Sequence, residues 1–300
     1  MAGEDVRIGL ARASRENMVA AVLLAPSLLF LAAFTYWPVF GVVLRSLTEQ
    51  RFGQSASWGF GNFIRLFADT HFHRVLVNTV LYAVGTIVPS LVLALFLAVA
   101  LSKPGRLTGL LRTVLMLPQM VPLVAAAALY VFVFLPGEGL LDHYLAYFGR
   151  YATNWLGSPD LALPSVILIT IWKNTGYYML FFLAGLAGIP ADLLEAARID
   201  GANGWRRFRD VTLPLLGPTF AFVGVIAMVN ALVQIDHIIV MTGGGPSDST
   251  NMILYYIYQQ AEQNLDLGLA SAATVVCVGV LLALALLSLR RLERGIHYES

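Results

Sequence analysis

The sequence predicts an all-α polytopic membrane protein with six transmembrane helices. Hydrophobic residues make up 58% of the 300 residues, charged residues only 12%, and the mean hydropathy is +0.74. Soluble domains carry about 25% charged residues, so this chain has too little polar surface to face water on all sides. The formal net charge of +1 also argues against nucleic acid as a partner, because such proteins present a strongly basic surface.

Six apolar stretches are long enough to cross the hydrocarbon core, which takes about 20 helical residues. They cover residues 19–44, 75–101, 110–134, 161–186, 213–241 and 268–289. The first is longer than the apolar core of a signal peptide, about 7–15 residues, so we expect it to remain in the mature chain. Several stretches are interrupted by Pro89, Pro118, Pro122 and Gly176. These interruptions predict either ordinary kinked helices or helices bent around a translocation path.

The Lys and Arg residues are divided unequally between the loops of the two sides. One side has thirteen: Arg7, Arg12, Arg15, Lys103, Arg106, Arg112, Arg198, Arg206, Arg207, Arg209, Arg290, Arg291 and Arg294. The other side has five: Arg45, Arg51, Arg65, Arg74 and Arg150. Because basic loops stay in the cytoplasm, both termini and the loop 189–212 are predicted to be cytoplasmic. The predicted organisation is a cytoplasmic arm (1–18), a membrane domain (19–289) and a cytoplasmic tail (290–300).

Motifs for nucleotide, metal and hydrolase chemistry are missing from the sequence. It contains no G-x-x-x-x-G-K-S/T, no H-E-x-x-H and no G-x-S-x-G, so we expect no ATP site, metal site or activated serine of these types. The single cysteine, Cys277, cannot form an internal disulfide. We therefore expect no catalytic residue, cofactor or metal in this chain. The energy for any transport must come from another subunit or from an ion gradient.

The predicted cytoplasmic loop contains the signals of a short helix. Pro190 suits a first turn, Asp192 and Glu195 place negative charge near the positive end of the helix, and Gly201 can adopt the left-handed conformation that ends it. One side of this helix carries apolar side chains, of which the two alanines are small: Leu193, Leu194, Ala196, Ala197 and Ile199. From these residues alone, the helix could lie on lipid headgroups or dock a cytoplasmic protein.

A spaced motif in the same loop resembles a known family. It reads Glu195-Ala196-Ala197, three residues, Gly201, nine residues and Val211-Thr212-Leu213-Pro214. This is similar to the EAA loop of bacterial binding-protein-dependent ABC importers, in which Ile stands where this chain has Val211. The resemblance implies the fold of a type I ABC importer permease (MetI-like). It also implies that the loop forms a coupling helix that docks in a cleft of an ATPase subunit through Glu195, Ala196, Ala197 and Gly201.

Further segments resemble the carbohydrate branch of this family, the maltose-permease type. They are residues 242–246 (TGGGP) and 255–258 (YYIY) on the predicted outer side. Residues 265–272 and 292–295 are most similar to the first permease of glycerol-3-phosphate importers. The extra periplasmic domain and additional spans of the maltose protein are absent here.

The resemblance covers most of the chain and implies an assembly in the bacterial inner membrane. The implied partners are a second related permease, two ATPase subunits that bind ATP and Mg, and an extracytoplasmic binding protein that does most of the selecting. The implied cargo is a sugar or a glycerol-phosphate-type solute.

Polar side chains within the spans are candidates for the substrate pathway, because burying them unpaired is costly. They form pairs at i, i+4 spacing, each on one helix face: Lys173 with Tyr177, Asn174 with Tyr178, and Asn230 with Gln234. The alternative is interhelical hydrogen bonding, with Lys173 reaching towards water. Gln119 has the same two interpretations. Asp236 and His237 could also suggest a proton relay, although we expect both near the outer end of the span.

Two other function classes remain open on the sequence alone. An ion-coupled secondary transporter usually has internal repeats and ionisable groups at mid-membrane, and no repeat is visible here. An intramembrane enzyme would need a catalytic constellation, and none is found. Neither class accounts for the motif in the predicted cytoplasmic loop, which a permease of an ATP-driven importer does.

Overall fold

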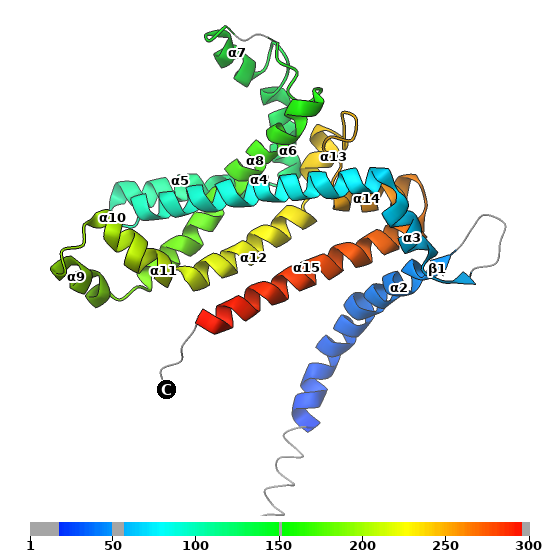
Figure 1. The fold of residues 1–300 in the computed structure, drawn as a ribbon, viewed down its shortest axis with the longest axis horizontal. Helices are drawn as coiled ribbons and strands as arrows, with labels where there is room; N and C mark the ends of the chain where they lie inside the picture. Colours follow the sequence, from blue (N-terminus) through cyan, green and yellow to red (C-terminus); the bar gives the residue numbers. More distant parts are fainter. Residues whose placement is uncertain (1–17, 50–56, 150–151, 296–300) are drawn as a thin grey trace, which may run out of the picture.

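The computed structural model describes residues 18–49, 57–149 and 152–295, and it is mostly helical (Figure 1). Five helices are long and apolar enough to cross a membrane: Met18–Ser46, Thr70–Ala100, Pro159–Ala187, Gly217–Met241 and Leu267–Leu287. A sixth candidate consists of two helices, Arg106–Met120 and Leu123–Val133, with a bend of 96° between them. All six predicted stretches therefore form helices, but the third is sharply bent and the fifth has a short interruption before residue 236. Residues 1–17 of the predicted arm and 296–300 of the predicted tail lie outside the described residues.

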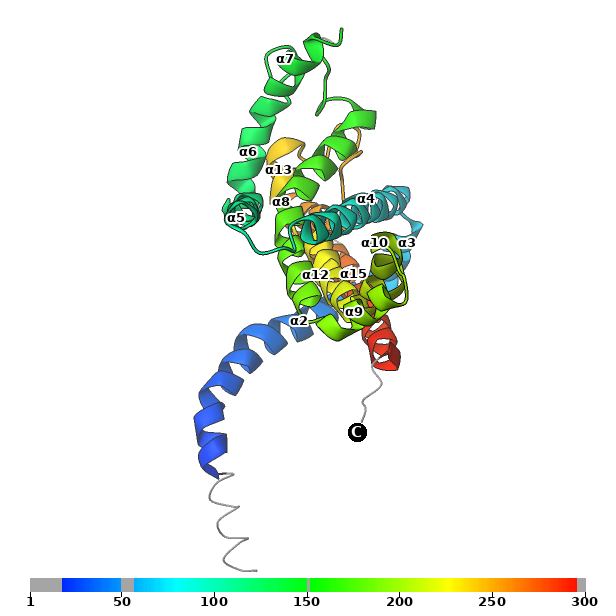
Figure 2. The same cartoon turned by 90° about the vertical axis from the view of Figure 1, so that its left-hand side faces the viewer.

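The first helix, Met18–Ser46, packs against α15 (Leu267–Gly295) near its C-terminal end, and its N-terminal part projects away from the other helices (Figures 1 and 2). It contains a π-helical turn, η1 (Ala32–Tyr36), and continues as α2 (Trp37–Ser46). None of its most apolar window is buried within the chain. A short antiparallel pair follows, in which β1 (Thr48–Glu49) pairs with β2 (Ser57–Trp58). The apolar surface of this helix must therefore be covered by lipid or by another protein.

Helix α4 (Thr70–Ala100) follows the short helix α3 (Gly61–Ala68) and is the central helix of the bundle. It begins after Asp69, whose carboxylate accepts a hydrogen bond from the His71 amide at 2.8 Å and so caps the helix. Helix α4 runs without a break through Pro89, one of the residues at which the sequence predicts a kink or bend. Proline removes only one backbone donor, and the packing of α4 against neighbouring helices holds the remaining turns in place.

The break in the third span has a local cause in the sequence. Helix α5 (Arg106–Met120) ends at Val121, whose backbone is extended (φ −77°, ψ 128°), and α6 (Leu123–Val133) begins after Pro122. A residue that precedes proline disfavours the helical conformation because its backbone clashes with the proline ring. The short helix α7 (Leu140–Ala146) follows in the connection to α8. Figure 2 shows α6 and α7 projecting on the opposite side of the molecule from the first helix.

Helix α8 (Pro159–Ala187) also runs without a break through Gly176, another residue at which the sequence predicts a kink or bend. Gly176 has a role in helix packing, because α5 crosses α8 at this point. A Cβ atom at Gly176 would lie 1.8 Å from the backbone oxygen of Leu115. Only glycine permits this approach, which resembles the close contacts of small residues between membrane helices.

The remaining elements complete the connections on both sides. On the predicted cytoplasmic side they are α9 (Ala191–Ile199), α10 (Gly204–Arg207), the π-helical turn η2 (Phe208–Thr212) and α11 (Leu213–Leu215). The fifth span is divided into α12 (Gly217–Val233) and α13 (Asp236–Met241). On the predicted outer side lie α14 (Ile253–Tyr258) and the π-helical turn η3 (Gln259–Gln263), followed by α15 (Leu267–Gly295). Helix α15 runs beyond residue 289, where the sequence predicted the last span to end.

Three clusters of buried apolar residues hold the helices together, and α4 contributes to each. The first joins α4 to α6, α8 and α13 around Tyr82 and Ile169. The second joins α4 to α3, α14 and α15 around Tyr256. The third joins α4 to α8 and α12 around Ala98 and Phe182. The packed body of the chain is therefore built on α4 and α8.

Candidate functional site

Helix α9 carries the motif predicted to couple the chain to an ATPase. Asp192 lies in its first turn and Arg198 in its last turn, so each charge faces the opposite partial charge of the helix end. Pro190 precedes the helix as its N-cap residue, with an extended ψ of 129°, rather than lying within the first turn. The predicted helix is confirmed, and Pro190 lies one residue before its first turn.

The end of α9 is fixed by Gly201, whose φ is +78°. The Ala202 amide donates to the Ala197 carbonyl at 2.9 Å, and the Gly201 amide donates to the Arg198 carbonyl at 3.1 Å. These two bonds form a Schellman motif, which satisfies carbonyls at a helix end. The predicted left-handed conformation of Gly201 is confirmed, and it turns the chain back towards the membrane domain.

One face of α9 rests on the chain and the other is open. Leu194 and Ala197 are partly buried, and the helix touches α10 and η2. Leu193 is 46% exposed and Ile199 82% exposed. Glu195 is also exposed, and in the part of the chain that the structure describes no salt bridge involves it. The helix thus combines a rigid backbone with an unpaired apolar and acidic face.

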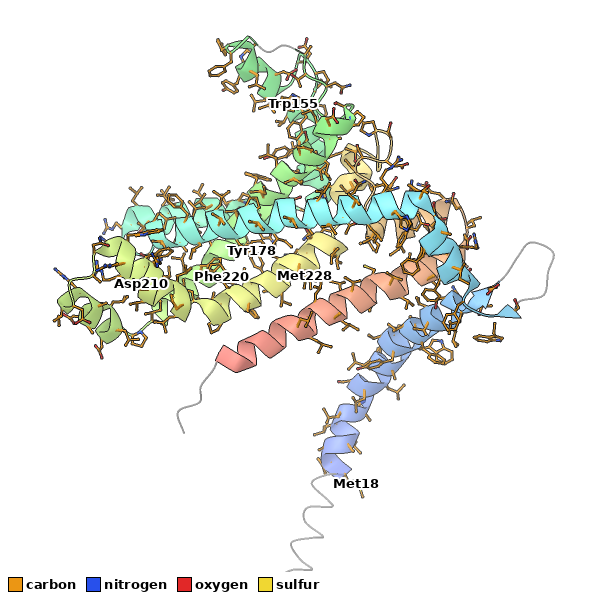
Figure 3. All side chains as sticks on the ribbon, viewed as in Figure 1. Met18, Trp155, Tyr178, Asp210, Phe220 and Met228 are labelled. Atoms are coloured by element: carbon orange, nitrogen blue, oxygen red, sulfur yellow. The ribbon has the colours of Figure 1, made fainter. Side chains whose placement is uncertain are left out.

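Only a short turn, residues 200–203, separates α9 from the helical segment that leads into the fifth span. The Asn203 side chain caps α10 by accepting a hydrogen bond from the Arg206 amide at 2.9 Å. The helical hydrogen bonds then continue through η2 and α11 into α12, where the Phe220 amide donates to the Leu216 carbonyl at 2.9 Å. Figure 3 shows Asp210 and Phe220 along this path. A displacement of α9 can therefore be transmitted to α12 through a nearly continuous helical backbone.

A second candidate element is a row of buried polar side chains between α4 and α8, which we call the polar seam. It consists of Tyr82, Thr86 and Ser90 on α4, and Thr170, Asn174 and Tyr178 on α8, each at most 3% exposed. Within each helix these residues are four apart, so they share one face. The Tyr82 hydroxyl lies 3.0 Å from the Thr170 hydroxyl. The polar seam is thus a row of hydrogen-bonding side chains buried between two otherwise apolar helices.

The seam reaches two further helices. At one end, the Tyr82 hydroxyl lies 2.8 Å from Nε2 of His237 on α13. At the other end, the Asn230 amide on α12 donates to the Tyr178 hydroxyl at 3.2 Å. Figure 3 shows Tyr178 between the ribbons of α4 and α12. The seam therefore links α4 and α8 to both halves of the fifth span.

The structure brings three of the predicted pathway residues together, namely Asn174, Tyr178 and Asn230. They meet within the chain's own helix packing, which is the interhelical hydrogen bonding weighed as the alternative. Gln234 lies at the end of α12 and is partly exposed, while Tyr177 packs edge-on against Phe181 with ring centroids 5.0 Å apart. Contact between these residues and a substrate stays a prediction.

Lys173 does not point into the polar seam. Its ammonium group donates to the backbone carbonyls of Pro118, Gln119 and Val121 at 3.2, 3.4 and 2.5 Å. These carbonyls lie at the end of α5, where the partial charge of a helix is negative. Lys173 therefore caps the broken span, which gives it a structural role that its sequence position did not reveal.

Sequence reasoning missed four residues of the polar seam: Tyr82, Thr86, Ser90 and Thr170. Each stands alone in an apolar stretch, where Ser, Thr and Tyr are ordinary constituents of a membrane helix. The available signal was the i, i+4 repeat of polar residues in two different stretches. Its meaning depends on pairing α4 with α8, and the two partners Tyr82 and Thr170 are 88 positions apart.

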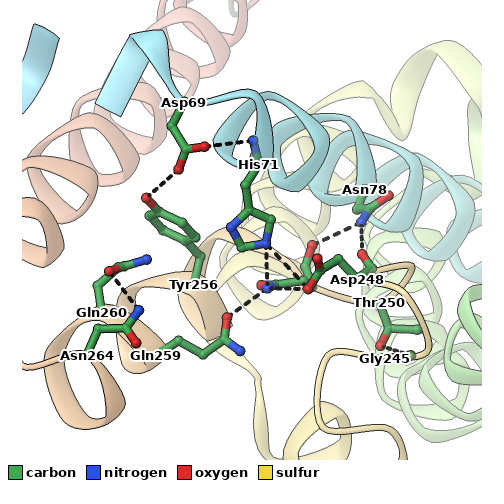
Figure 4. A network of polar contacts seen from close by, with 11 residues as sticks. Asp69, His71, Asn78, Gly245, Asp248, Thr250, Tyr256, Gln259, Gln260 and Asn264 are labelled. Atoms are coloured by element: carbon green, nitrogen blue, oxygen red, sulfur yellow. Dashed lines mark hydrogen bonds and ion pairs between the residues drawn. The ribbon is translucent and has the colours of Figure 1, made fainter. Parts of the chain in front are cut away.

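On the predicted outer side, a network of polar contacts fixes the segment after α13 against the start of α4 (Figure 4). The Asn78 amide donates to the backbone carbonyls of Asp248 and Asn251 at 2.7 and 3.1 Å. Nε2 of His71 lies 3.4 Å from the Asp248 carboxylate. The Tyr256 hydroxyl donates to Asp69 at 3.4 Å, and burial together with this carboxylate raises the pKa of the Tyr256 phenol. The segment with the predicted outer-loop motif is thus held in one conformation.

Comparison with known proteins identifies the class to which this fold and loop belong. Residues 90–298 match the family described as the inner-membrane component of binding-protein-dependent transport systems. The chain belongs to this family, and it is a membrane-spanning permease component of such a system.

Two relatives cover nearly the whole chain. The chain is 36% identical over 282 residues to the sn-glycerol-3-phosphate transport system permease protein UgpA of Agrobacterium fabrum. The matched residues make up 92% of this chain and 95% of that protein. This chain is also 33% identical over 288 residues to UgpA of Escherichia coli (strain UTI89), which covers 95% and 97%.

Solved structures support the same fold. A chain of a bacterial ABC transporter involved in the import of the acidic polysaccharide alginate matches with a TM-score of 0.83 and 25% identity, over 95% of this chain and 98% of that one. A chain of a bacterial alginate ABC transporter, in complex with a periplasmic protein that holds an alginate pentasaccharide, matches with a TM-score of 0.81 over 92% and 94%. The predicted all-α importer-permease fold is confirmed.

Proposed function

We propose that this chain forms half of the translocation pathway of an ATP-driven importer for a glycerol-phosphate or sugar-type solute. In this proposal a second, related permease forms the other half, and two ATPase subunits bind ATP and Mg. An extracytoplasmic binding protein delivers the solute. Both termini of the chain and α9 lie in the cytoplasm.

The observation that carries the proposal is the open face of α9. A short helix with a fixed C-terminal turn, followed after residues 200–203 by a nearly continuous helical backbone into α12, can move as one body. Its exposed residues Leu193, Ala196 and Ile199 offer an apolar contact, and Glu195 offers a charge for a donor on a partner. Apolar side chains that are left open to water in this way favour a protein partner. Closure of an ATPase pair around α9 would then displace the fifth span.

The nature of the solute is proposed from the relatives and from one feature of the chain. The UgpA proteins are named for sn-glycerol-3-phosphate transport, and the matching solved transporter imports a polysaccharide. Lys173, a buried cation that could attract a phosphate, is occupied by three backbone carbonyls. We therefore assign recognition of the solute's charge to the binding protein or the second permease.

An assembly experiment tests the proposal. The chain is co-expressed with a candidate second permease, ATPase and binding protein, purified as a complex and placed in lipid nanodiscs. We expect binding protein loaded with glycerol-3-phosphate to stimulate ATP hydrolysis, and the same protein without solute to stimulate it less. Maltose is the uncharged comparison solute. ATP hydrolysis by the purified chain alone, or transport driven by an ion gradient without the ATPase, would contradict the proposal and favour an ion-coupled secondary transporter.

A further inference from the structure

A small cavity lies within the polar seam, where α4, α8 and α12 meet. The space open to the centre of a water molecule is about 10 Å³, which is close to the minimum that holds one water. Thr86, Ser90, Thr170, Asn174 and Tyr178 line it, and alanines of α12 close it on the apolar side. Five of the eight residues that line the cavity therefore carry a polar side chain, and the cavity has room for a single small molecule.

Two atoms at this cavity lack a hydrogen-bond partner among the described residues. They are the Ser90 hydroxyl oxygen and Oδ1 of Asn174, both fully buried. Other hydroxyl groups on the same two helices donate to the carbonyl four residues earlier, for example Thr86 to Tyr82 at 2.8 Å and Thr170 to Val166 at 3.0 Å. Ser90 does not follow this common pattern. Its hydroxyl is available to a partner that the chain itself does not supply.

The side chains that line the cavity favour a water molecule over an ion. Unpaired polar groups in a membrane interior are costly, because no bulk water reaches them. The residues that line the cavity include no Asp, Glu, Lys, Arg or His, so a bound ion would keep an uncompensated charge. Water is neutral, both donates and accepts, and typically makes two to four hydrogen bonds in such sites.

We propose that one ordered water molecule occupies this cavity and bridges Ser90 on α4 to Asn174 on α8. The water accepts a hydrogen bond from the Ser90 hydroxyl and donates one to Oδ1 of Asn174. If the Asn174 amide is rotated by 180°, its NH2 group donates to the water, which then donates to the Ser90 oxygen. The bridge stands beside the Tyr178–Asn230 bond, so three helices meet at one hydrated point. A water bridge can be broken and remade when helices shift, whereas a packed apolar contact loses its fit. The bridge thus lets α4 and α8 adjust to each other beside the contact with the fifth span.

A double-mutant cycle on the assembled importer in nanodiscs tests the bridge. Ser90→Ala and Asn174→Leu should each lower the thermal unfolding midpoint. The double variant should lower it no further than the more damaging single change, because the second change removes a group that the first had left unpaired. The matched control pairs Ser90→Ala with Thr175→Val. Thr175 is buried one position from Asn174, and its hydroxyl already donates to the Ile171 carbonyl at 2.6 Å, so these two effects should add.

Additive effects of Ser90→Ala and Asn174→Leu would overturn the proposal. Replacement of sodium by choline should leave the midpoint unchanged, and a shift would identify a cation instead of water. Hydroxyl-radical footprinting of the unmodified importer provides a test that needs no variant. Radicals formed from a bound water should oxidise Tyr178 more than Phe182, which is equally buried one turn further along α8 and does not line the cavity. Equal protection of both rings would also overturn the proposal.

Discussion

At the scale of single residues, Asp142 organises the connection between α6 and α8. Its carboxylate accepts hydrogen bonds from the Gly137 amide at 2.8 Å, the Thr153 amide at 2.8 Å and the Trp155 indole at 2.7 Å. The Gly137 bond, with those from Trp155 and Thr153, lowers the pKa of Asp142 below its ordinary value, although burial acts in the opposite direction. One side chain therefore gathers three separate points of an irregular segment.

The lowered pKa of Asp142 predicts an acid-sensitive connection. Because the folded pKa is depressed, the carboxylate stabilises this segment fully above the ordinary pKa of aspartate, and the contribution is lost as the pH falls through the lowered pKa. We expect the ¹⁹F resonance of fluorinated Trp155, assigned with Trp155→Phe, to shift over this acidic range. Asp142→Asn, which has no proton to gain, should remove the transition. An unchanged transition in that variant would assign it to another group.

Lys173 allows a structural role to be separated from a substrate-binding role. Replacing it with Met removes the donor from three carbonyls at the broken span, and an unpaired buried acceptor costs about 1–3 kcal/mol. We expect Lys173→Met to lower the thermal stability of the permease and to reduce uptake of every solute alike. Lys173→Arg, which keeps a cation, should lose less. A variant of normal stability whose KM rises only for phosphorylated solutes would show that Lys173 binds substrate.

At the scale of elements, the coupling function depends on how α9 ends. A Cβ atom added to Gly201 would meet no other atom within 4 Å, so the left-handed φ of +78° is the reason that a side chain is disfavoured there. Gly201→Val should cost about 1–2 kcal/mol locally, and Gly201→Asn, which tolerates this conformation, should cost less. We expect the Val variant to insert normally, to lose ATPase co-purification and to lose uptake.

Glu195→Lys gives the same element a second test, because it reverses the exposed charge without changing the backbone. It should also insert and lose uptake, with an ATPase that dissociates easily or ignores substrate. Membrane level, ATPase co-purification and uptake are measured together. If α9 is only a folded connection, both variants will either transport normally or fail to insert.

The elements also show what a sequence can predict and what it cannot. Pro190 and Gly201 are local signals, so the position and end of α9 followed directly from them. The spans were found because hydropathy is a property of each segment. Pro118 and Pro122 were predicted to interrupt the third span, but the size of the bend between its two halves was not. Helices α4 and α8 are unbroken at Pro89 and Gly176. The effect of a proline or glycine on a helix depends on what packs against it, as α5 does against Gly176.

At the scale of the whole molecule, the chain leaves large apolar surfaces that its own helices do not cover. The helix Met18–Ser46 buries none of its apolar window within the chain, and α6 and α7 project on the opposite side of the body (Figure 2). Both are consistent with a subunit whose surfaces are completed by lipid and by other chains. The polar seam belongs to this scale too, since it could not be predicted without knowing that α4 and α8 are neighbours. Two stretches with ordinary Tyr, Ser and Thr residues become a connected path only in three dimensions.

The π-helical turn η2 has a consequence for how related chains can vary in length. It is closed by a hydrogen bond from the Leu213 amide to the Phe208 carbonyl, five positions apart, so it holds one residue more than an α-helical turn. A regular α-helix completes a turn in about 3.6 residues, or about 100° per residue, whereas η2 completes its turn with one residue more. The extra residue is therefore absorbed within the turn, and the segments on its two sides keep nearly the orientation that a regular helix would give them. A related chain that lacks this one residue could form a regular turn here and still present α9 in nearly the same direction. A residue added to the regular helical turn of α10 would instead rotate α9 by about 100° relative to α12.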